Sequence, residues 1–213
     1  MKFIYLLLIA CMGIGCHNTA TQPNKTQHKD STQQTAQRIS PPLSERERLI
    51  AVLQQFQKDM ASRNKEAIAS YFHFPIRNDL LVLSYFDSAF DKQIEQNNDF
   101  IPRSLFLAYF NAIYEDQEMR GFADLFRNLQ LASLKDTAVK EIKAEIANKV
   151  CMHYYAITLE NDTVTLEYGV YTNEAYTNKF PNNPEMECAE YAGIWTFRFD
   201  GQKLIFDRHL VAG

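Results

Sequence analysis

The sequence predicts an α+β domain in which N-terminal helices pack on a curved, antiparallel, four-stranded meander. Up to about residue 150, apolar residues recur with the three- and four-residue spacing of helices. Beyond that point the spacing changes to the alternation of strands, and turn signals divide the alternating stretches into two hairpins. Runs of helices followed by runs of strands are typical of the α+β class.

Residues 1–16 have the pattern of an export signal. Lys2 precedes an unbroken apolar run, 3–15, which is too short to span a bilayer and ends in small residues just before Cys16. The segment resembles the signal peptides of bacterial lipoproteins, in which such a cysteine is lipidated, as with palmitate, and becomes the N-terminus. The resemblance implies a domain anchored to a membrane of the bacterial cell envelope, in the periplasm or at the cell surface.

Cys11 is the alternative lipidation site. Leu8 stands three residues before Cys11, where the lipoprotein motif has an aliphatic residue, whereas Gly13 occupies that position before Cys16. Only eight apolar residues precede Cys11, however, and the apolar run must be long enough to engage the export machinery. We therefore predict lipidation at Cys16, with Cys11 or an ordinary secretory signal as the alternatives.

Residues 17–43 are predicted to form a disordered tether that precedes a folded domain, 44–213. The tether contains five Thr, five Gln and only two large apolar residues, which bury too little surface to offset the entropy of ordering. The domain carries 18 basic and 25 acidic residues. This negative balance, without a basic block, argues against nucleic acid as a partner.

Two helices are predicted at the start of the domain. Ser44 and Glu47 form a capping-box pattern, after which apolar residues follow at helical spacing over 45–62. Asn64 is the predicted cap of a shorter second helix. Residues 80–90 are apolar and fit either a strand or a helix.

Three further helices are predicted before the spacing changes. Pro102 begins one that extends to about Ile113, and the apolar pattern of 122–129 indicates another. Asp136 is the predicted cap of the last helix. The apolar face of this helix consists of Val139, Ile142 and Ile146.

The first predicted hairpin joins strands 151–160 and 163–172 through the two-residue turn Asn161-Asp162. Its register pairs Tyr155 with Tyr168 and His153 with Val170. The second hairpin turns at Asp200-Gly201, which is a stronger signal for a two-residue turn. Its register pairs Phe197 with Leu204, Trp195 with Phe206 and Gly193 with Arg208. In this register Arg208 faces the helices, whereas Asp207 and His209 face away.

This order of elements resembles the NTF2-like superfamily, also called SnoaL-like, whose members form a cone-shaped domain. The resemblance lies in helix 45–62, in segments 64–68 and 71–76, and in the closing strands 191–197 and 203–206. Members of the family include isomerases and dehydratases as well as binding and assembly modules without catalysis. The family therefore implies a fold and leaves the activity open. A cystatin-like domain is the alternative fold.

Four side chains on the predicted inner face of the sheet are candidate ligand-binding residues. They are His153, Tyr155, Tyr168 and Arg208. An inward cation beside Gly193, which leaves room for it, suits a carboxylate of a small-molecule or peptide ligand. The competing interpretation is that Arg208 and His153 lie near the sheet ends and reach solvent.

We predict a non-catalytic ligand-binding or assembly module. The alternative is an isomerase or hydratase in which His153, flanked by tyrosines, is the general base. No cofactor and no metal site is expected, because the sequence lacks the nucleotide, zinc-protease and serine-hydrolase motifs. A further alternative is a scaffold with a filled core, which meets a protein partner through Tyr154, Glu167 and Tyr171 on the outer sheet face.

Cys151 and Cys188 are the only cysteines of the predicted domain, and an oxidising cell envelope favours their pairing. The predicted registers separate them by two strand spacings, about 9.6 Å, which is beyond the reach of a disulfide unless the chain ends curl together. Two buried free thiols are the alternative.

Overall fold

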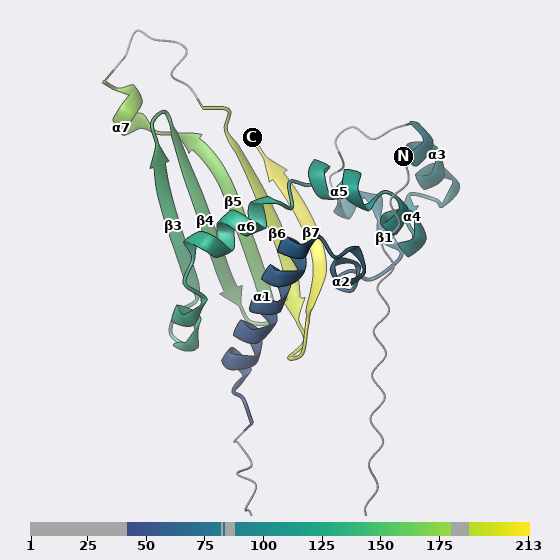
Figure 1. The fold of residues 1–213 in the computed structure, drawn as a ribbon, viewed down its shortest axis with the longest axis horizontal. Coiled ribbons are helices and arrows are strands. Elements are labelled where there is room, and N and C mark those ends of the chain that lie inside the picture. The colour runs from purple at the N-terminus through teal and green to yellow at the C-terminus, as the bar shows by residue number, and fades with distance from the viewer. Residues whose placement is uncertain (1–41, 82, 84–87, 180–187) are drawn as a thin grey trace, which may run out of the picture. The chain divides into compact units, whose positions relative to one another are not determined.

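A five-stranded antiparallel sheet is the largest element of the structure, a computed structural model that describes residues 42–81, 83, 88–179 and 188–213. Its strands are β3 (Glu141–Asn148), β4 (Cys151–Glu160), β5 (Thr163–Thr172), β6 (Tyr191–Phe199) and β7 (Leu204–Ala212). Each strand pairs with the next one along the chain, so the sheet is a meander (Figure 1). The structure therefore belongs to the predicted α+β class.

The predicted signal peptide, both candidate lipidation sites, Cys11 and Cys16, and residues 17–41 of the tether lie outside the described residues. Within the part of the chain that the structure describes, no helix combines the length and apolar character needed to cross a bilayer.

Two helices, α1 (Glu45–Ser62) and α6 (Gly121–Asn128), lie on the same face of the sheet (Figure 1). A second group of elements lies beyond the β7 edge of the sheet: α2 (Lys65–Ala69), β1 (Ile76–Arg77), η1 (Asn78–Leu80), α3 (Ser88–Gln96), β2 (Phe100–Ile101), α4 (Arg103–Ala108) and α5 (Phe110–Asp116). The remaining short elements are η2 (Leu131–Lys135), which precedes β3, and α7 (Glu174–Thr177), which follows β5.

Helix α1 begins and ends where the sequence predicts. The Ser44 hydroxyl accepts a hydrogen bond from the Glu47 amide (3.3 Å), and the Glu47 carboxylate accepts one from the Ser44 amide (2.9 Å). This reciprocal capping box satisfies two donors that the first turn leaves free. The buried stripe of the helix consists of Leu49, Ile50, Leu53, Phe56 and Met60. Asn64 caps α2 as predicted, by accepting from the Ala67 amide (3.3 Å).

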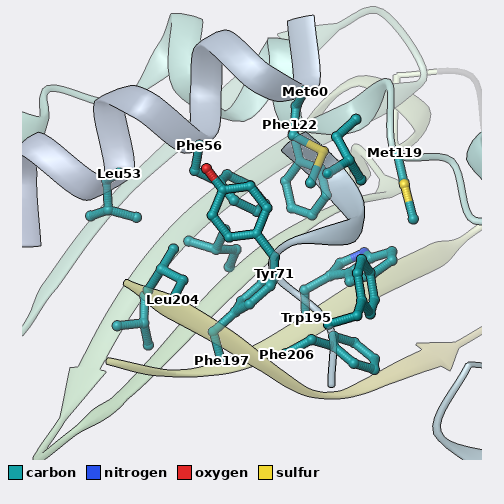
Figure 2. Close-up of a cluster of buried hydrophobic side chains, with 14 of the residues drawn as sticks. Leu53, Phe56, Met60, Tyr71, Met119, Phe122, Trp195, Phe197, Leu204 and Phe206 are labelled. Atoms are coloured by element: carbon teal, nitrogen blue, oxygen red, sulfur yellow. The ribbon is translucent and has the colours of Figure 1, made fainter. Parts of the chain in front are cut away.

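The core between helices and sheet is centred on the ring of Phe56, which is fully buried. Its centroid lies 4.9 Å from that of Tyr71, 5.1 Å from that of Phe122 and 5.2 Å from that of Phe197. Figure 2 shows α1, α6 and the last two strands contributing side chains to this one cluster. Edge-to-face rings of this kind fill the space beneath α1.

The prediction of a helix capped by Asp136 was wrong, because residues 141–148 form strand β3. Ile142 and Ile146 are four residues apart, which fits a helix, but they also alternate with Glu141 and Glu145, which fits a strand. Pairing with β4 decides between the two patterns, since Ile142 lies opposite Ile157 in the ladder. The sheet consequently has five strands instead of the predicted four.

The predicted helix from Pro102 to Ile113 is divided at Tyr109. Tyr109 has φ −102° and ψ 15°, which departs from helical geometry, and α4 ends before it while α5 begins after it. Phe106 and Ile113, one from each helix, are both fully buried.

The first hairpin has the predicted register, with Tyr155 opposite Tyr168 and His153 opposite Val170. The second does not, because its connection has four residues, 200–203, instead of two. The Asp200 carboxylate accepts hydrogen bonds from the Gln202 and Lys203 amides (both 2.9 Å), which stabilises the longer turn. Phe197 therefore pairs with Phe206, not with Leu204 as predicted.

A β-bulge in the β6–β7 pair changes the face on which the end of β7 lies. The register shifts between Thr196 and Phe197, so that Trp195 lies opposite His209 and Thr196 opposite Arg208. The extra residue on β7 reverses the side-chain alternation beyond Phe206. His209 is consequently buried on the inner face, and Arg208 is exposed.

Cys151 and Cys188 form a disulfide, with Cα atoms 5.4 Å apart. Strand β6 begins only at Tyr191, and the preceding residues cross the end of β5. There the Cys188 amide donates to the Thr172 hydroxyl (3.2 Å). The predicted distance of two strand spacings does not apply, because the residues before β6 return to the end of β5. The alternative of two free thiols is therefore wrong.

Candidate functional site

A cavity of about 120 Å³ lies at the edge of the packed core. It is lined by Asp116, Gln117, Glu118, Tyr168, Tyr191, Gly193, His209 and Val211. The end of α5 and the residues after it supply the acidic side, while β5, β6 and β7 supply the rest. Its inner wall is buried at Tyr168, Gly193 and His209, whereas the rim at Tyr191 and Val211 is exposed.

His209 is a deeply buried polar group of this cavity, with 3% of its surface exposed. Its ring stacks on Trp195 with centroids 4.2 Å apart and planes inclined by 23°. The stacking follows from the register, because the β-bulge places these two residues opposite each other. Burial lowers the pKa of His209 from 6.5 to about 4, although the nearby Asp116 carboxylate opposes part of this effect.

Hydrogen bonds assign the tautomer of the His209 ring. The Gln117 side-chain nitrogen donates to the Asp116 carboxylate (2.8 Å), which leaves the Gln117 side-chain oxygen directed at His209 Nδ1 (2.7 Å). Because that oxygen only accepts, the neutral ring carries its proton on Nδ1. The other ring nitrogen, Nε2, then has a free lone pair and is a hydrogen-bond acceptor.

Tyr168 forms the adjoining wall, and its hydroxyl is already engaged on both sides. It donates to the main-chain carbonyl of Glu118 (2.9 Å), with that of Gln117 at 3.4 Å, and it accepts from the indole N–H of Trp195 (3.2 Å). Burial raises the pKa of Tyr168 far above its usual value. The phenol is therefore a structural hydrogen-bonding group that fixes Trp195 and the residues after α5.

The rim of the cavity carries two carboxylates, Asp116 and Glu118. Tyr191 is 37% exposed. Burial, and then the charge of the Glu118 carboxylate, raise the pKa of its phenol. None of the described lining residues is Lys or Arg. The cavity thus presents acceptors and negative charge to whatever enters it.

The structure brings only one of the four predicted ligand-binding residues to this cavity. Tyr168 lines it, on the same sheet face as Trp195. Tyr155 is buried beside Tyr168 in the ladder, but it does not line the cavity. His153 is partly buried opposite Val170 and does not line the cavity.

The predicted inward orientation of Arg208 opposite Gly193 was wrong, as was the outward orientation of His209. Gly193 pairs with Val211, and Arg208 is exposed on the outer face. The signal for this change was present in the sequence. Asp207 and Arg208 are consecutive charged residues after Phe206, and such a break in alternation is typical of a β-bulge.

Gln117 and His209 are the functional candidates that sequence reasoning missed. Nothing in the local sequence joins them, since 92 residues separate them along the chain.

The described residues contain no cluster of three or more His, Cys, Asp or Glu side chains able to hold a metal ion. Comparison of the chain with protein-family models, curated proteins and solved structures gives no match.

Gly121→Ala is expected to lower the free energy of unfolding by about 1–3 kcal/mol. A Cβ atom at this position would overlap the Tyr168 ring, whose hydroxyl is held in place by hydrogen bonds. Alanine favours a helix more than glycine does. A loss of stability would therefore come from the overlap with the Tyr168 ring. Urea unfolding measures the loss of stability. Gly193→Ala is the comparison and should cost less, because a Cβ there would meet the same ring at 3.2 Å. Wild-type stability for Gly121→Ala would contradict the packing described.

Acidification from pH 6.5 to 4 is expected to remove about 3 kcal/mol of stability through His209. The folded-state pKa of about 4 lies below the unfolded value of 6.5, so in this window only the unfolded chain takes up the proton. Stability is therefore highest above pH 6.5 and falls as the pH falls. Urea unfolding of His209→Gln across this range should show a flatter profile, with exposed His73→Gln as the control for loss of one histidine. Parallel profiles for wild type and His209→Gln would contradict the assignment.

Proposed function

We propose that residues 44–213 form a non-catalytic, ligand-binding module of the NTF2-like cone type, which binds a small ligand in the His209 cavity. The cavity is the observation that most directly supports this proposal. At about 120 Å³ it has room for several water molecules or a ligand of a few heavy atoms, but not for a drug-sized molecule. The helices α1 and α6 on one face of an antiparallel meander support the fold part of the proposal.

The polar wall of the cavity supports a role in binding. Gln117 and His209 are almost completely buried, with 2% and 3% of their surfaces exposed. Keeping two polar side chains beside an aromatic core costs free energy that apolar residues would not cost. Their hydrogen bond offsets part of this cost, and it also holds the imidazole ring at the cavity wall.

The test of this proposal uses Trp195, the single tryptophan of the chain, as a reporter. Its contact with His209 makes its fluorescence sensitive to events in the cavity. The full chain is titrated with propylammonium, 1-propanol and propionate, three probes of equal carbon number and different charge. We expect a saturable change with at least one probe, loss of that change in His209→Phe, and its retention in the matched control His153→Phe. Absence of saturation with all three probes would overturn the proposal.

We also propose that the chain is an exported bacterial lipoprotein, anchored by lipid at Cys16, with Cys11 as the alternative site. The Cys151–Cys188 disulfide supports export, because such bonds persist in oxidising compartments. Labelling with a palmitate analogue in a bacterial host tests the anchor. Cys16→Ala should abolish labelling and membrane attachment, whereas Cys11→Ala should retain both; the reverse pattern would move the anchor to Cys11.

A protein scaffold is the second candidate function, because aromatic side chains fill the space beneath α1. On the outer sheet face, the Tyr154 hydroxyl donates to the Glu167 carboxylate (3.0 Å), and its ring lies 6.0 Å from that of Tyr171. Cross-linking in intact cells distinguishes the two functions. A cross-linked protein that Tyr154→Ala removes, together with no saturable binding by any of the three probes, would favour the scaffold.

A further inference from the structure

We propose that the ligand of the His209 cavity is a small organic cation with N–H donors, such as a primary ammonium group on a short carbon chain. This inference rests on the proposed function and specifies its ligand class. The first observation is the charge of the lining: Asp116 and Glu118 are carboxylates, and no Lys or Arg accompanies them among the described residues that line the cavity. A carboxylate ligand, which Arg208 was expected to hold, would meet like charge from these two lining residues.

The second observation is the buried His209 ring in the same wall. The ring is 97% buried, and Gln117 at Nδ1 is the one hydrogen-bond partner that the described residues give it. Its remaining polar atom, Nε2, accepts hydrogen bonds in this tautomer. His209 lines the cavity, and an acceptor at a cavity wall is completed by a ligand that donates. The His209 ring therefore favours a ligand with a hydrogen-bond donor, and this preference does not depend on the two carboxylates.

The Tyr168 hydroxyl does not supply a competing donor, because it donates to a main-chain carbonyl. Tyr191 lies at the rim, where burial and the nearby Glu118 carboxylate raise the pKa of its phenol. Both aromatic side chains nevertheless line the cavity, and tyrosine rings attract cations through their faces. An ammonium group has three donors, which match two carboxylates and one imidazole nitrogen, while its short carbon chain contacts Val211 at the rim.

Binding of propylammonium to the full chain, followed by Trp195 fluorescence, tests the ligand class. We expect saturable binding of propylammonium, with 1-propanol and propionate at least about tenfold weaker. Glu118→Gln and Asp116→Asn should each weaken propylammonium binding by about tenfold, because each removes a charged acceptor. Glu115→Gln is the matched control, since Glu115 is exposed, pairs with Arg63 (2.8 Å) and does not line the cavity.

The outcomes separate the ligand class from the site. Saturable binding of propionate or 1-propanol in preference to propylammonium would overturn the cation inference and leave the binding site in place. Equal weakening by Glu115→Gln and Glu118→Gln would also overturn it, because the effect would then come from net charge alone. Saturation by none of the probes would overturn the binding site and the inference together.

Discussion

Phe56→Ala is expected to lower the free energy of unfolding by about 3–5 kcal/mol, the largest effect of any single substitution considered for this domain. The Phe56 ring is fully buried and meets rings from α6, from the segment after α2 and from β6. Its removal leaves a cavity that these elements cannot all close, because they are held by separate parts of the chain. Urea unfolding at neutral pH measures the loss.

The control for Phe56→Ala is Phe100→Ala, at a position that is 37% exposed. Because truncation there leaves no closed cavity, we expect a loss of stability well below that of Phe56→Ala. The comparison tests whether α1 is packed on the sheet. Equal effects of the two substitutions would contradict a core centred on Phe56.

Reduction of the Cys151–Cys188 bond is expected to cost about 4 kcal/mol of stability, because the bond closes a loop of 37 residues in the unfolded chain. Cys151→Ser, Cys188→Ser and the double variant should then all lose a similar amount. This equality distinguishes loss of the bond from loss of two independent side-chain contacts, whose effects would add. Urea unfolding with and without reductant measures each value.

The double cysteine variant provides the internal control, since reductant should not change its unfolding midpoint. An unchanged midpoint of the wild-type chain on reduction would contradict a disulfide at this position. Additive losses in the two single variants would contradict it as well. The measurement applies to the oxidised chain, in which the bond also ties the residues before β6 to the start of β4.

Elements whose ends are specified by local chemistry were predicted from sequence. Helix α1 has a capping box and one apolar stripe, and the first hairpin has a two-residue turn with matched apolar alternation. In both cases a few neighbouring residues determine the structure, so no knowledge of the rest of the fold is needed. The α+β class followed from the same patterns.

Strand β3 depended on contacts that the local sequence does not reveal, and the second hairpin has a longer turn and a bulge that the simplest interpretation of its sequence misses. Residues 141–146 fit a helix and a strand equally, and pairing with β4 decides the outcome. The Asp200 turn is longer by two residues because its carboxylate caps two amides. A single bulge then moved Arg208 out of the candidate site and His209 into it.

The candidate site was therefore only partly predictable. Tyr168 was identified because its face follows from the correct first hairpin. Gln117 was not, because it is polar, although it continues the helical spacing of the buried residues Phe110, Ile113 and Tyr114 in α5. Its partner is His209, whose orientation required the bulge. A polar pair of this kind is visible only when the helices are placed over the sheet.

The nitrogen NMR signals of the His209 ring provide the most direct test of the proposed binding site. At neutral pH the account predicts a proton on Nδ1 and none on Nε2, since Gln117 accepts from Nδ1. Addition of propylammonium should shift the Nε2 signal to a saturating value and leave the His153 ring unchanged. A proton on Nε2, or an Nε2 signal unaffected by every one of the three probes, would contradict the central claim that this ring faces a ligand site.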